Sequence, residues 1–123
     1  MKHSDLLVWQ KAMNLVTEIY ITTATFPNEE RFGLVSQARR AAVSIPSNIA
    51  EGHGRKLTGA YINHLSIAYG SLMELETQTQ IAVRLSFVPE DKASALLKQM
   101  DEIGKMLTGL KNSLSEEGVR IFV

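Results

Sequence analysis

A stripe of small apolar side chains, with a proline inside it, most constrains how this chain folds. Within residues 33–56 (GLVSQARRAAVSIPSNIAEGHGRK), such residues recur at steps of three and four, the spacing that lines one face of an α-helix. Alanine and glycine let helices approach closely, so we expect a central helix with axis separations at or below roughly 8–10 Å. The stripe consists of Leu34, Ala38, Ala41, Ala42, Ile45, Ile49 and Gly52.

A row of polar residues borders this stripe, again at helical spacing: Gln37, Ser44, Asn48, Glu51 and Arg55. A buried polar group without a partner costs about 1–3 kcal/mol. We therefore expect Glu51 to meet an arginine, a helix N-terminus or water. Together with Ser71 and Glu74 of a later segment, we interpret the row as a structural network that fixes helix register or an oligomer contact. A catalytic or ligand site around Ser44, Asn48 and Glu51 is the alternative.

Pro46 lies inside this predicted helix. Proline removes one backbone donor and clashes with the carbonyl four residues earlier, which belongs to Ala42. We expect a proline-interrupted helix, with either a kink at residues 42–45 or a break and restart at residues 44–47. Nearby Ser or Asn side chains are candidates to satisfy the freed carbonyl. Gly52 and Gly54 are expected to end the helix with positive φ.

The same spacing predicts three further amphipathic helices. The first covers about residues 5–24, is capped by Ser4 or Asp5 and is stopped by Phe26-Pro27. The core stripes expected in the three helices are Leu6, Trp9, Met13, Val16 and Tyr20, widened by Ala12 and Ile19; then Tyr61, Leu65, Ala68, Leu72, Leu75, Thr79 and Ala82, widened by Ile62, Tyr69 and Leu85; and finally Leu96, Met100, Ile103, Leu107, Leu110 and Leu114.

Several local features refine the last two helices. Thr58 is the expected N-cap of the third helix, and Pro89 is expected at the first position of the fourth. Glycine within a helix costs about 1 kcal/mol relative to alanine, so Gly70 and Ser71 are expected to face a close helix contact. Glu74 is a candidate partner for an arginine of the second helix. The chain thus divides into a helical bundle, residues 1–115, and a tail, residues 116–123, that is too short for another helix. Disorder of this apolar tail and docking in a groove are both open.

The composition limits the classes of function. With 123 residues and 45% hydrophobic residues the chain fits one globular domain, and 13 basic residues balance 13 acidic ones. The absence of cysteine excludes disulfides and thiolate chemistry. No run is apolar enough for a membrane span or signal peptide, so we expect a cytoplasmic protein. Residues 33–56 nevertheless hold four bases, Arg39, Arg40, Arg55 and Lys56, against the single acid Glu51. They form a candidate nucleic-acid-binding patch or are solvated and paired.

Motifs for catalysis or cofactor binding are missing from the sequence. His3, His53 and His64 have no metal-ligand spacing, and no glutamate is followed by a histidine three residues later, as a di-iron bundle requires. Neither a Gly-x-Ser-x-Gly elbow nor a phosphate-binding P-loop occurs. We therefore predict no enzymatic activity, no metal and no cofactor. Because the aromatic residues fall mostly on apolar stripes, any nucleic-acid contact is expected to be to phosphates.

Several segments closely resemble the family of 23S ribosomal RNA intervening-sequence proteins. The most specific are SIPSNIAEG at residues 44–52 and the later GSxxEL at residues 70–75; the others are Phe26-Pro27, Glu30, Phe32-Gly33-Leu34, Gln37, Arg39-Arg40-Ala41-Ala42 and Ala68-Tyr69. The resemblance implies an all-α, antiparallel up-down four-helix bundle, encoded in bacteria, that assembles as a homopentamer. The family is similar to accessory proteins of diversity-generating retroelements, which are basic and contact nucleic acid and a reverse transcriptase.

We therefore expect a non-enzymatic oligomeric bundle protein that serves as a scaffold in an RNA or ribonucleoprotein context. RNA or a reverse transcriptase is its candidate partner. The alternative is a protein that binds nucleic-acid phosphates through Arg39, Arg40, Arg55 and Lys56.

Overall fold

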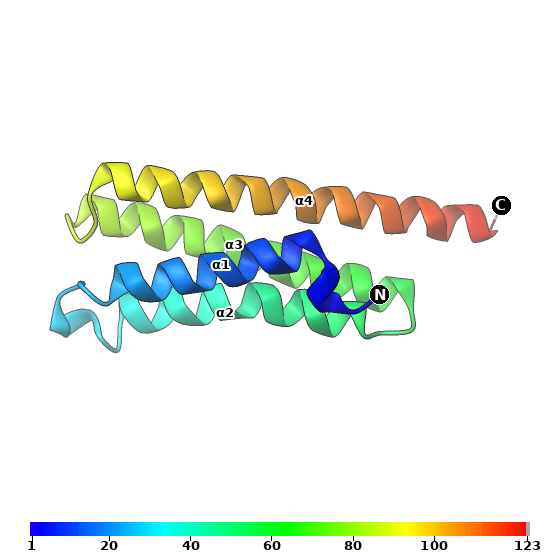
Figure 1. Ribbon diagram of the computed structural model, residues 1–123, viewed down its shortest axis with the longest axis horizontal. Helices are drawn as coiled ribbons and strands as arrows, with labels where there is room; N and C mark the ends of the chain where they lie inside the picture. The colour runs from blue at the N-terminus through cyan, green and yellow to red at the C-terminus, as the bar shows by residue number, and fades with distance from the viewer. Residues whose placement is uncertain (123) are drawn as a thin grey trace.

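Four antiparallel α-helices account for most of the part of the chain that is described, which is the backbone of residues 1–122 and the side chains of residues 1–115 (Figure 1). The structure is a computed structural model. The helices are α1 (Leu7–Thr23), α2 (Leu34–His53), α3 (Thr58–Arg84) and α4 (Glu90–Phe122), and the 3-10 turns η1 (His3–Asp5) and η2 (Asn28–Glu30) precede α1 and α2. The expected all-α, up-down four-helix bundle is confirmed.

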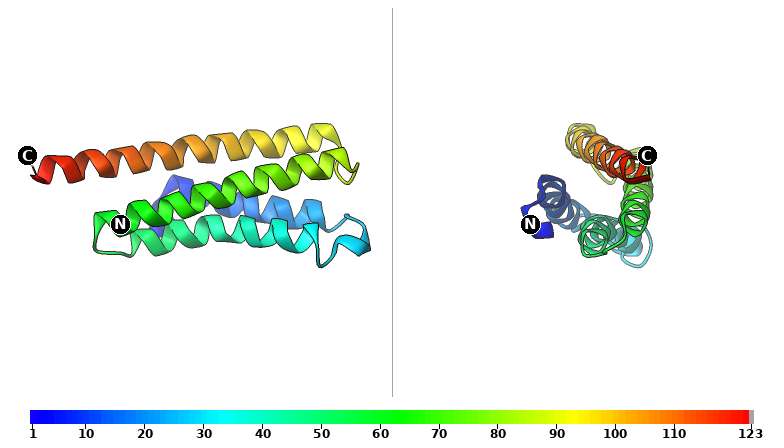
Figure 2. Two further views of the ribbon diagram at one scale, coloured as in Figure 1. Left: turned by 180° about the vertical axis from the view of Figure 1, so that it is seen from behind. Right: turned by 90° about the vertical axis from the view of Figure 1, so that its right-hand side faces the viewer.

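The helices follow one another around a common axis. Seen along that axis, α1, α2, α3 and α4 occupy successive corners (Figure 2). Each helix packs on its two neighbours, with the most extensive contact between α2 and α3 and the least between α1 and α4. We call the outward-facing surface along the contact of two neighbouring helices their outer seam. The outer seam of α1 and α2 therefore lies on the opposite side of the bundle from that of α3 and α4. At its C-terminal end α4 extends past the other three helices (Figure 1).

The small-residue stripe of α2 is buried, as predicted. Five of its seven residues, Ala38, Ala41, Ala42, Ile45 and Ile49, lie in the main core with the core side chains of α3 and α4, and Leu34 lies in a smaller cluster. Leu65, Leu72, Leu96 and Leu107 are among the fully buried side chains that these helices contribute. A smaller cluster around Val88 closes the end of the bundle where α3 joins α4. The heptad spacing of α4 predicted its core face correctly, because Leu96, Met100, Ile103 and Leu107 are buried.

The core face of α1 differs from the prediction. Its buried residues are Val8, Ala12, Leu15, Ile19 and Thr23. Ala12 and Ile19, which were expected to widen the stripe, are in the core, whereas the five main residues of the expected stripe lie at its edge or outside it. Trp9 and Val16 are only partly buried, and Met13 and Tyr20 are each 42% exposed. Apolar residues cover more than half of the circumference of α1, so periodicity did not select one face. The helix consequently presents a second apolar face to the surface.

Pro46 lies in α2 without ending it. The helix is continuous from Leu34 to His53, so the expected break and restart is wrong, and the kink stays a prediction. The predicted support from nearby side chains takes a different form. Ser47 Oγ donates to the carbonyl of Val43 at 2.8 Å, and Asn48 Nδ2 donates to that of Ser44 at 2.9 Å. Both bonds reinforce the turn that contains the proline.

Two predictions about glycines, at Gly54 and at Gly70, are wrong, whereas Gly52 on the small-residue stripe meets a neighbouring helix closely as expected. Gly54 ends α2 at φ −78°, not at positive φ. No neighbouring atom lies within 4 Å of where a Cβ of Gly70 would be, so the close contact expected at Gly70 and Ser71 is wrong for Gly70, whereas Ser71 does meet Ser44 of α2. The close approaches are at Gly52, where a Cβ would lie 2.7 Å from Cβ of His64, and at Gly104, where it would lie 3.3 Å from Cδ2 of Leu72. These two glycines allow α3 to pack tightly against α2 and α4.

Some predicted helix ends are displaced by one or two residues. Leu6 and Leu57 occupy the N-cap positions of α1 and α3 in place of Ser4 or Asp5 and of Thr58. The last helix begins at Glu90, directly after Pro89. Tyr69 and Leu85, expected to widen the core stripe of α3, are exposed.

The backbone of residues 116–122 continues α4 and does not form a separate element. The expectation of a docked or disordered apolar tail concerns side chains that lie outside the described residues.

Candidate functional site

Four polar side chains connect α2 to α3 through a chain of hydrogen bonds. Oγ of Ser44 and Oγ of Ser71 are 2.8 Å apart, and Nδ2 of Asn48 donates to Oγ of Ser44 at 3.1 Å. Nδ1 of His64 lies 3.0 Å from Oδ1 of Asn48. Because an amide oxygen only accepts, Nδ1 of His64 carries the hydrogen in this arrangement. Three residues of the predicted polar row, Ser44, Asn48 and Ser71, therefore join His64 in a network across the α2/α3 interface, which we call the Asn48 network (Ser44, Asn48, His64 and Ser71).

Glu51 lies at the exposed edge of this network. Its carboxylate forms the expected ion pair with an arginine, Arg55, at 3.0 Å, and its other oxygen is 3.8 Å from Nδ1 of His64. Both side chains of the ion pair are more than half exposed. An exposed pair of this kind contributes at most about 1 kcal/mol. Glu51 therefore borders the network without anchoring it.

The remaining members of the predicted row, Gln37 and Glu74, are exposed. They line a polar surface hollow of ≈ 280 Å³ together with Ser44, Ser71 and Arg40. Among the described residues, Glu74 forms no ion pair with an arginine, in contrast to the expectation. The row thus has an inner part that joins two helices and an outer part that faces solvent.

The structure separates the four bases that were expected to form one patch. Arg39 and Arg40 lie in the first half of α2, whereas Arg55 and Lys56 follow its C-terminal end. At 1.5 Å per residue, Arg39 and Arg55 are about 24 Å apart along the helix axis. Arg55 is moreover paired with Glu51. The first two arginines therefore belong to a different surface from the last two bases.

Arg39 is held against α1 by three contacts. Nε donates to Oγ1 of Thr23 at 3.0 Å, a terminal nitrogen donates to the carbonyl of Tyr20 at 3.2 Å, and Cζ lies 4.5 Å from the centre of the Tyr20 ring. Thr23 is itself buried and donates to the carbonyl of Ile19 at 2.7 Å. A planar guanidinium has five N–H donors. Because these bonds occupy two of its nitrogens, Arg39 keeps donors for a ligand.

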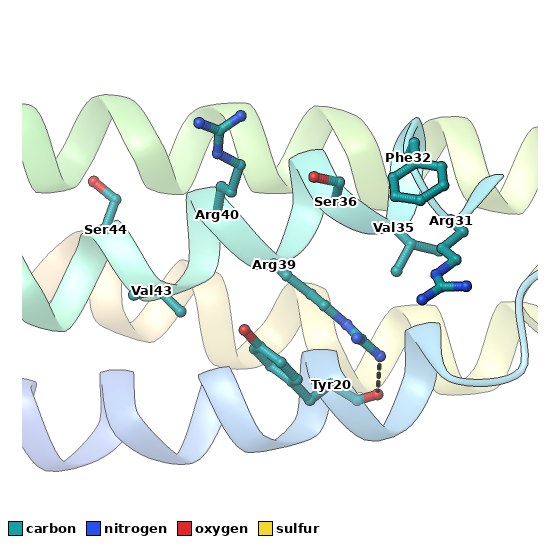
Figure 3. Close-up of a pocket in the computed structure, with 9 residues that line it drawn as sticks. All are labelled: Tyr20, Arg31, Phe32, Val35, Ser36, Arg39, Arg40, Val43 and Ser44. Carbon is teal, nitrogen blue, oxygen red and sulfur yellow. Dashed lines mark hydrogen bonds between the residues drawn. The ribbon is translucent and has the colours of Figure 1, made fainter.

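Arg39 lines a surface hollow of ≈ 640 Å³ at the outer seam of α1 and α2. Figure 3 shows Arg39 reaching toward α1, Arg40 directed to the other side, toward α3, and Arg31 with Phe32 at the start of α2. We call this surface the arginine hollow; its main polar and aromatic lining residues are Tyr20, Arg31, Phe32, Ser36, Arg39 and Arg40. Among the described residues that line it, three are arginines and none is acidic.

Two of these lining residues are exposed aromatics. Phe32 is 85% exposed, and Cζ of Arg31 lies 5.3 Å from the centre of its ring. Tyr20 is exposed as well. We expected the aromatic residues to lie mostly on the apolar stripes that face the core. Phe32 and Tyr20 do not follow this expectation, because both are exposed at this surface.

His64, Arg31 and Phe32 were not selected as site residues from the sequence. The histidines had been considered only as metal ligands, and Arg31 and Phe32 lie in the short connection between α1 and α2. The available signals were weak. One signal was that His64 follows Tyr61 by three residues, so that both lie on the same side of the predicted helix. The other was that Phe32 stands next to Arg31 in a short connection, where side chains are usually exposed.

One ionisable side chain near the network has a shifted pKa. Burial raises the pKa of Tyr61, because the low-polarity surroundings disfavour the charged phenolate. The Tyr61 ring packs at Gly52 and edge-on to the His53 ring, with 5.8 Å between ring centres. Among the described residues there is no group of three or more His, Asp or Glu side chains placed to hold a metal ion. Nor is any described helix long and apolar enough to cross a membrane.

The fold and this surface define a small all-α bundle protein with a polar network between its two central helices. Residues 4–109 match the family described as 23S rRNA-intervening sequence protein, and the chain belongs to that family. The resemblance found in the sequence is thereby confirmed. A crystal structure of a protein of unknown function from the S23 ribosomal protein family of Bacteroides thetaiotaomicron has the same fold. It aligns with a TM-score of 0.78 and 22% identity over 85% of this chain and 98% of the other. Among curated proteins, none matches this chain.

Proposed function

We propose that this protein is a non-enzymatic homo-oligomeric bundle that serves as a scaffold in an RNA or ribonucleoprotein context of the bacterial cytoplasm. The observation that carries the proposal is the second apolar face of α1. Trp9, Met13 and Val16 of this face line a surface groove of ≈ 360 Å³ with Val43, Pro46 and Ala50 of α2, and we call it the Trp9 groove. Contiguous exposed apolar surface of this kind is typical of protein interfaces.

A second groove on the opposite side of the bundle is the surface that we propose meets the Trp9 groove of a neighbouring copy. It has a volume of ≈ 340 Å³ at the α3/α4 seam, and we call it the Met73 groove; its lining includes Tyr69, Met73, Glu76, Met100, Asp101 and Lys105. Two different faces on opposite sides of one subunit favour head-to-tail contacts, which close into a ring when the rotation between copies allows it. We propose a ring of five copies, the number that the family resemblance implies.

The RNA context of this proposal rests on the names of the relatives. The family is named after 23S rRNA intervening sequences, and the structural neighbour is assigned to a ribosomal protein family. RNA is therefore one partner that we propose, and a reverse transcriptase is the other, because the family is similar to accessory proteins of diversity-generating retroelements.

The assembly is tested with two complementary variants, Met13→Glu in the Trp9 groove and Met73→Glu in the Met73 groove. Native mass spectrometry should show a closed oligomer for the unmodified protein and a monomer for each variant. An equimolar mixture of the variants keeps one intact contact and should give a heterodimer. Leu85→Glu, which changes an exposed residue outside both grooves, is the matched control and should assemble normally. A monomeric unmodified protein, or assembly unaffected by Met13→Glu, would refute the proposal.

A second function, binding of nucleic-acid phosphates, is favoured by the three arginines and the lack of acidic residues in the arginine hollow. Contacts to phosphates release counterions, so the affinity for RNA should fall steeply with added salt. We expect the double variant Arg39→Gln/Arg40→Gln to lose most of this affinity in a filter-binding assay. Arg55→Gln/Lys56→Gln should retain it, because those bases lie at the far end of α2. No binding at low salt, or an equal loss in both double variants, would contradict this site.

A further inference from the structure

The chemistry of the arginine hollow suggests a more specific ligand than a phosphate backbone in general. Its volume of ≈ 640 Å³ falls within the range of about 300–1,000 Å³ that ligand pockets occupy. It combines guanidinium groups, hydroxyl groups and two exposed aromatic rings. Duplex nucleic acids hide the faces of their bases, whereas single strands present them for stacking. Exposed aromatic rings next to cations are therefore more useful for binding single strands than duplexes.

The exposure of the large aromatic side chain of Phe32 is not explained by packing of the core. At 85% exposed it contributes little to either core cluster, yet it stands at the start of α2, where the chain is held in place. The carboxylate of Glu30 accepts a hydrogen bond of 3.1 Å from the backbone N–H of Leu34, which ties the connection to the first turn of the helix. The side chain of Glu30 is thus engaged at the helix terminus and does not line the hollow. Phe32 is consequently presented on an anchored backbone beside Arg31.

Arg39 is likewise positioned before any ligand arrives. Its bonds to Thr23 and to the carbonyl of Tyr20 restrict the guanidinium to the floor of the hollow. A pre-positioned guanidinium loses less side-chain entropy on binding than a free one. Arg31 is exposed and its guanidinium lies next to the ring of Phe32, and within residues 1–115 it forms no ion pair. The hollow therefore holds one fixed arginine, Arg39, and one adjustable arginine, Arg31, that lies next to the exposed ring.

We propose that the arginine hollow binds a segment of single-stranded nucleic acid, with a backbone phosphate on Arg31 and Arg39 and a base stacked on Phe32. This inference rests on the second function proposed above and adds the class of ligand and the stacking residue. It uses the arginine half of the α1/α2 seam, while the contact between copies uses the Trp9 groove. Val43 lies at the boundary between the two.

The test measures fluorescence anisotropy of labelled oligonucleotides of about ten nucleotides, a length within the range of single-strand binding sites. The probes are oligouridine, oligothymidine and a blunt duplex of the same length. The unmodified full-length protein should bind both single strands more tightly than the duplex. Tight binding of both single strands is expected because phosphate contacts and stacking do not require the 2′-hydroxyl. Duplex binding as tight as that of the single strands would overturn the proposal.

The variant Phe32→Ala separates stacking from charge. It should weaken single-strand affinity about 5- to 100-fold, the usual effect of removing one stacking aromatic, while Phe32→Trp retains the affinity. Leu57→Ala, which removes an exposed apolar side chain at the other end of α2, is the matched control and should bind as the unmodified protein does. Unchanged affinity in Phe32→Ala would overturn the stacking inference, and the phosphate-binding function would survive if charge variants still weakened binding.

Arg31→Gln reports on the phosphate contact. It should weaken binding to all probes and reduce the slope of log affinity against log salt by about one. Lys98→Gln, a change of an exposed base on α4 that lies outside both grooves and the hollow, should leave both quantities unaltered. No binding of any probe at about 50 mM salt would refute the phosphate-binding function together with this inference. If Phe32→Ala dissociates the oligomer while binding persists, the hollow is a contact between copies and the proposal is wrong.

Discussion

Asn48 of α2 joins His64 of α3 through a hydrogen bond of 3.0 Å between its Oδ1 and Nδ1 of the imidazole. The same amide donates to the hydroxyl and to the carbonyl of Ser44. One side chain thus satisfies groups on its own helix and on the neighbouring one. A slip of α3 by a single residue would break this bond, so the Asn48 network is suited to fixing the register of the two central helices.

Asn48→Ala should lower the free energy of unfolding by about 1–3 kcal/mol, because it leaves the partly buried His64 without its acceptor. Urea denaturation at one fixed protein concentration measures the change, since an oligomer's stability depends on concentration. Glu51→Ala is the comparison and should cost at most about 1 kcal/mol, because the Glu51 side chain is exposed. Equal losses in the two variants would contradict the central role of Asn48.

Gly52→Ala should destabilise the protein by about 1–3 kcal/mol, because the new Cβ would lie 2.7 Å from Cβ of His64 and force the helices apart. Gly70→Ala is the matched control within a helix. It meets no atom within 4 Å and should stabilise the protein by about 0.5–1 kcal/mol through the better helix propensity of alanine. Thermal unfolding of both variants would show shifts of opposite sign. Shifts of the same sign would mean that packing at Gly52 is not limiting.

Gln78→Met should raise stability by about 1 kcal/mol. Oε1 of Gln78 is buried and accepts no hydrogen bond from the described residues, and methionine fills similar space without an unpaired oxygen. Gln80→Met, at an exposed position of the same helix, should have little effect. Urea denaturation would measure both changes, and a loss of stability in Gln78→Met would indicate that the oxygen has a partner after all.

Stability should fall as the pH rises above about 10, the ordinary pKa of tyrosine. Burial raises the pKa of Tyr61, so the folded protein retains a proton there that the unfolded chain loses. The contribution is fully present below the unfolded pKa and is lost as the pH rises through the folded pKa. Tyr61→Phe removes this contribution, and lysines titrate equally in both proteins. Unfolding free energies measured from pH 8 to 11 should therefore decline less steeply in the variant.

Much of the bundle was predictable because its signals are local. The spacing of small residues in α2 and of leucines in α4 each leaves one plausible buried face, and both predictions were correct. In α1, apolar residues on two faces satisfy the same periodicity. The face with Ala12 and Thr23 enters the core, and the face with Met13 remains outside. Only packing against α2 and α4 distinguishes these faces.

The candidate sites were predictable to different degrees. The polar row on α2 was recognised because its members share one helix, and Ser71 was included with it as a residue of a later segment. His64 was missed because its partner is sixteen residues away. Arg31, Phe32 and Tyr20 were missed as a group because they come from a connection and from another helix. Conversely, Arg55 and Lys56 were grouped with Arg39 although the helix separates them.

The sequence by itself determined the helical elements, the core faces of α2 and α4, and the family, because helix formation and apolar spacing depend on residues only a few positions apart. Tertiary structure decided which face of α1 is buried, and which histidine completes the polar network. It also decided which arginines share a surface. These properties depend on how helices are rotated and placed against one another, and that arrangement arises from contacts between residues distant along the chain.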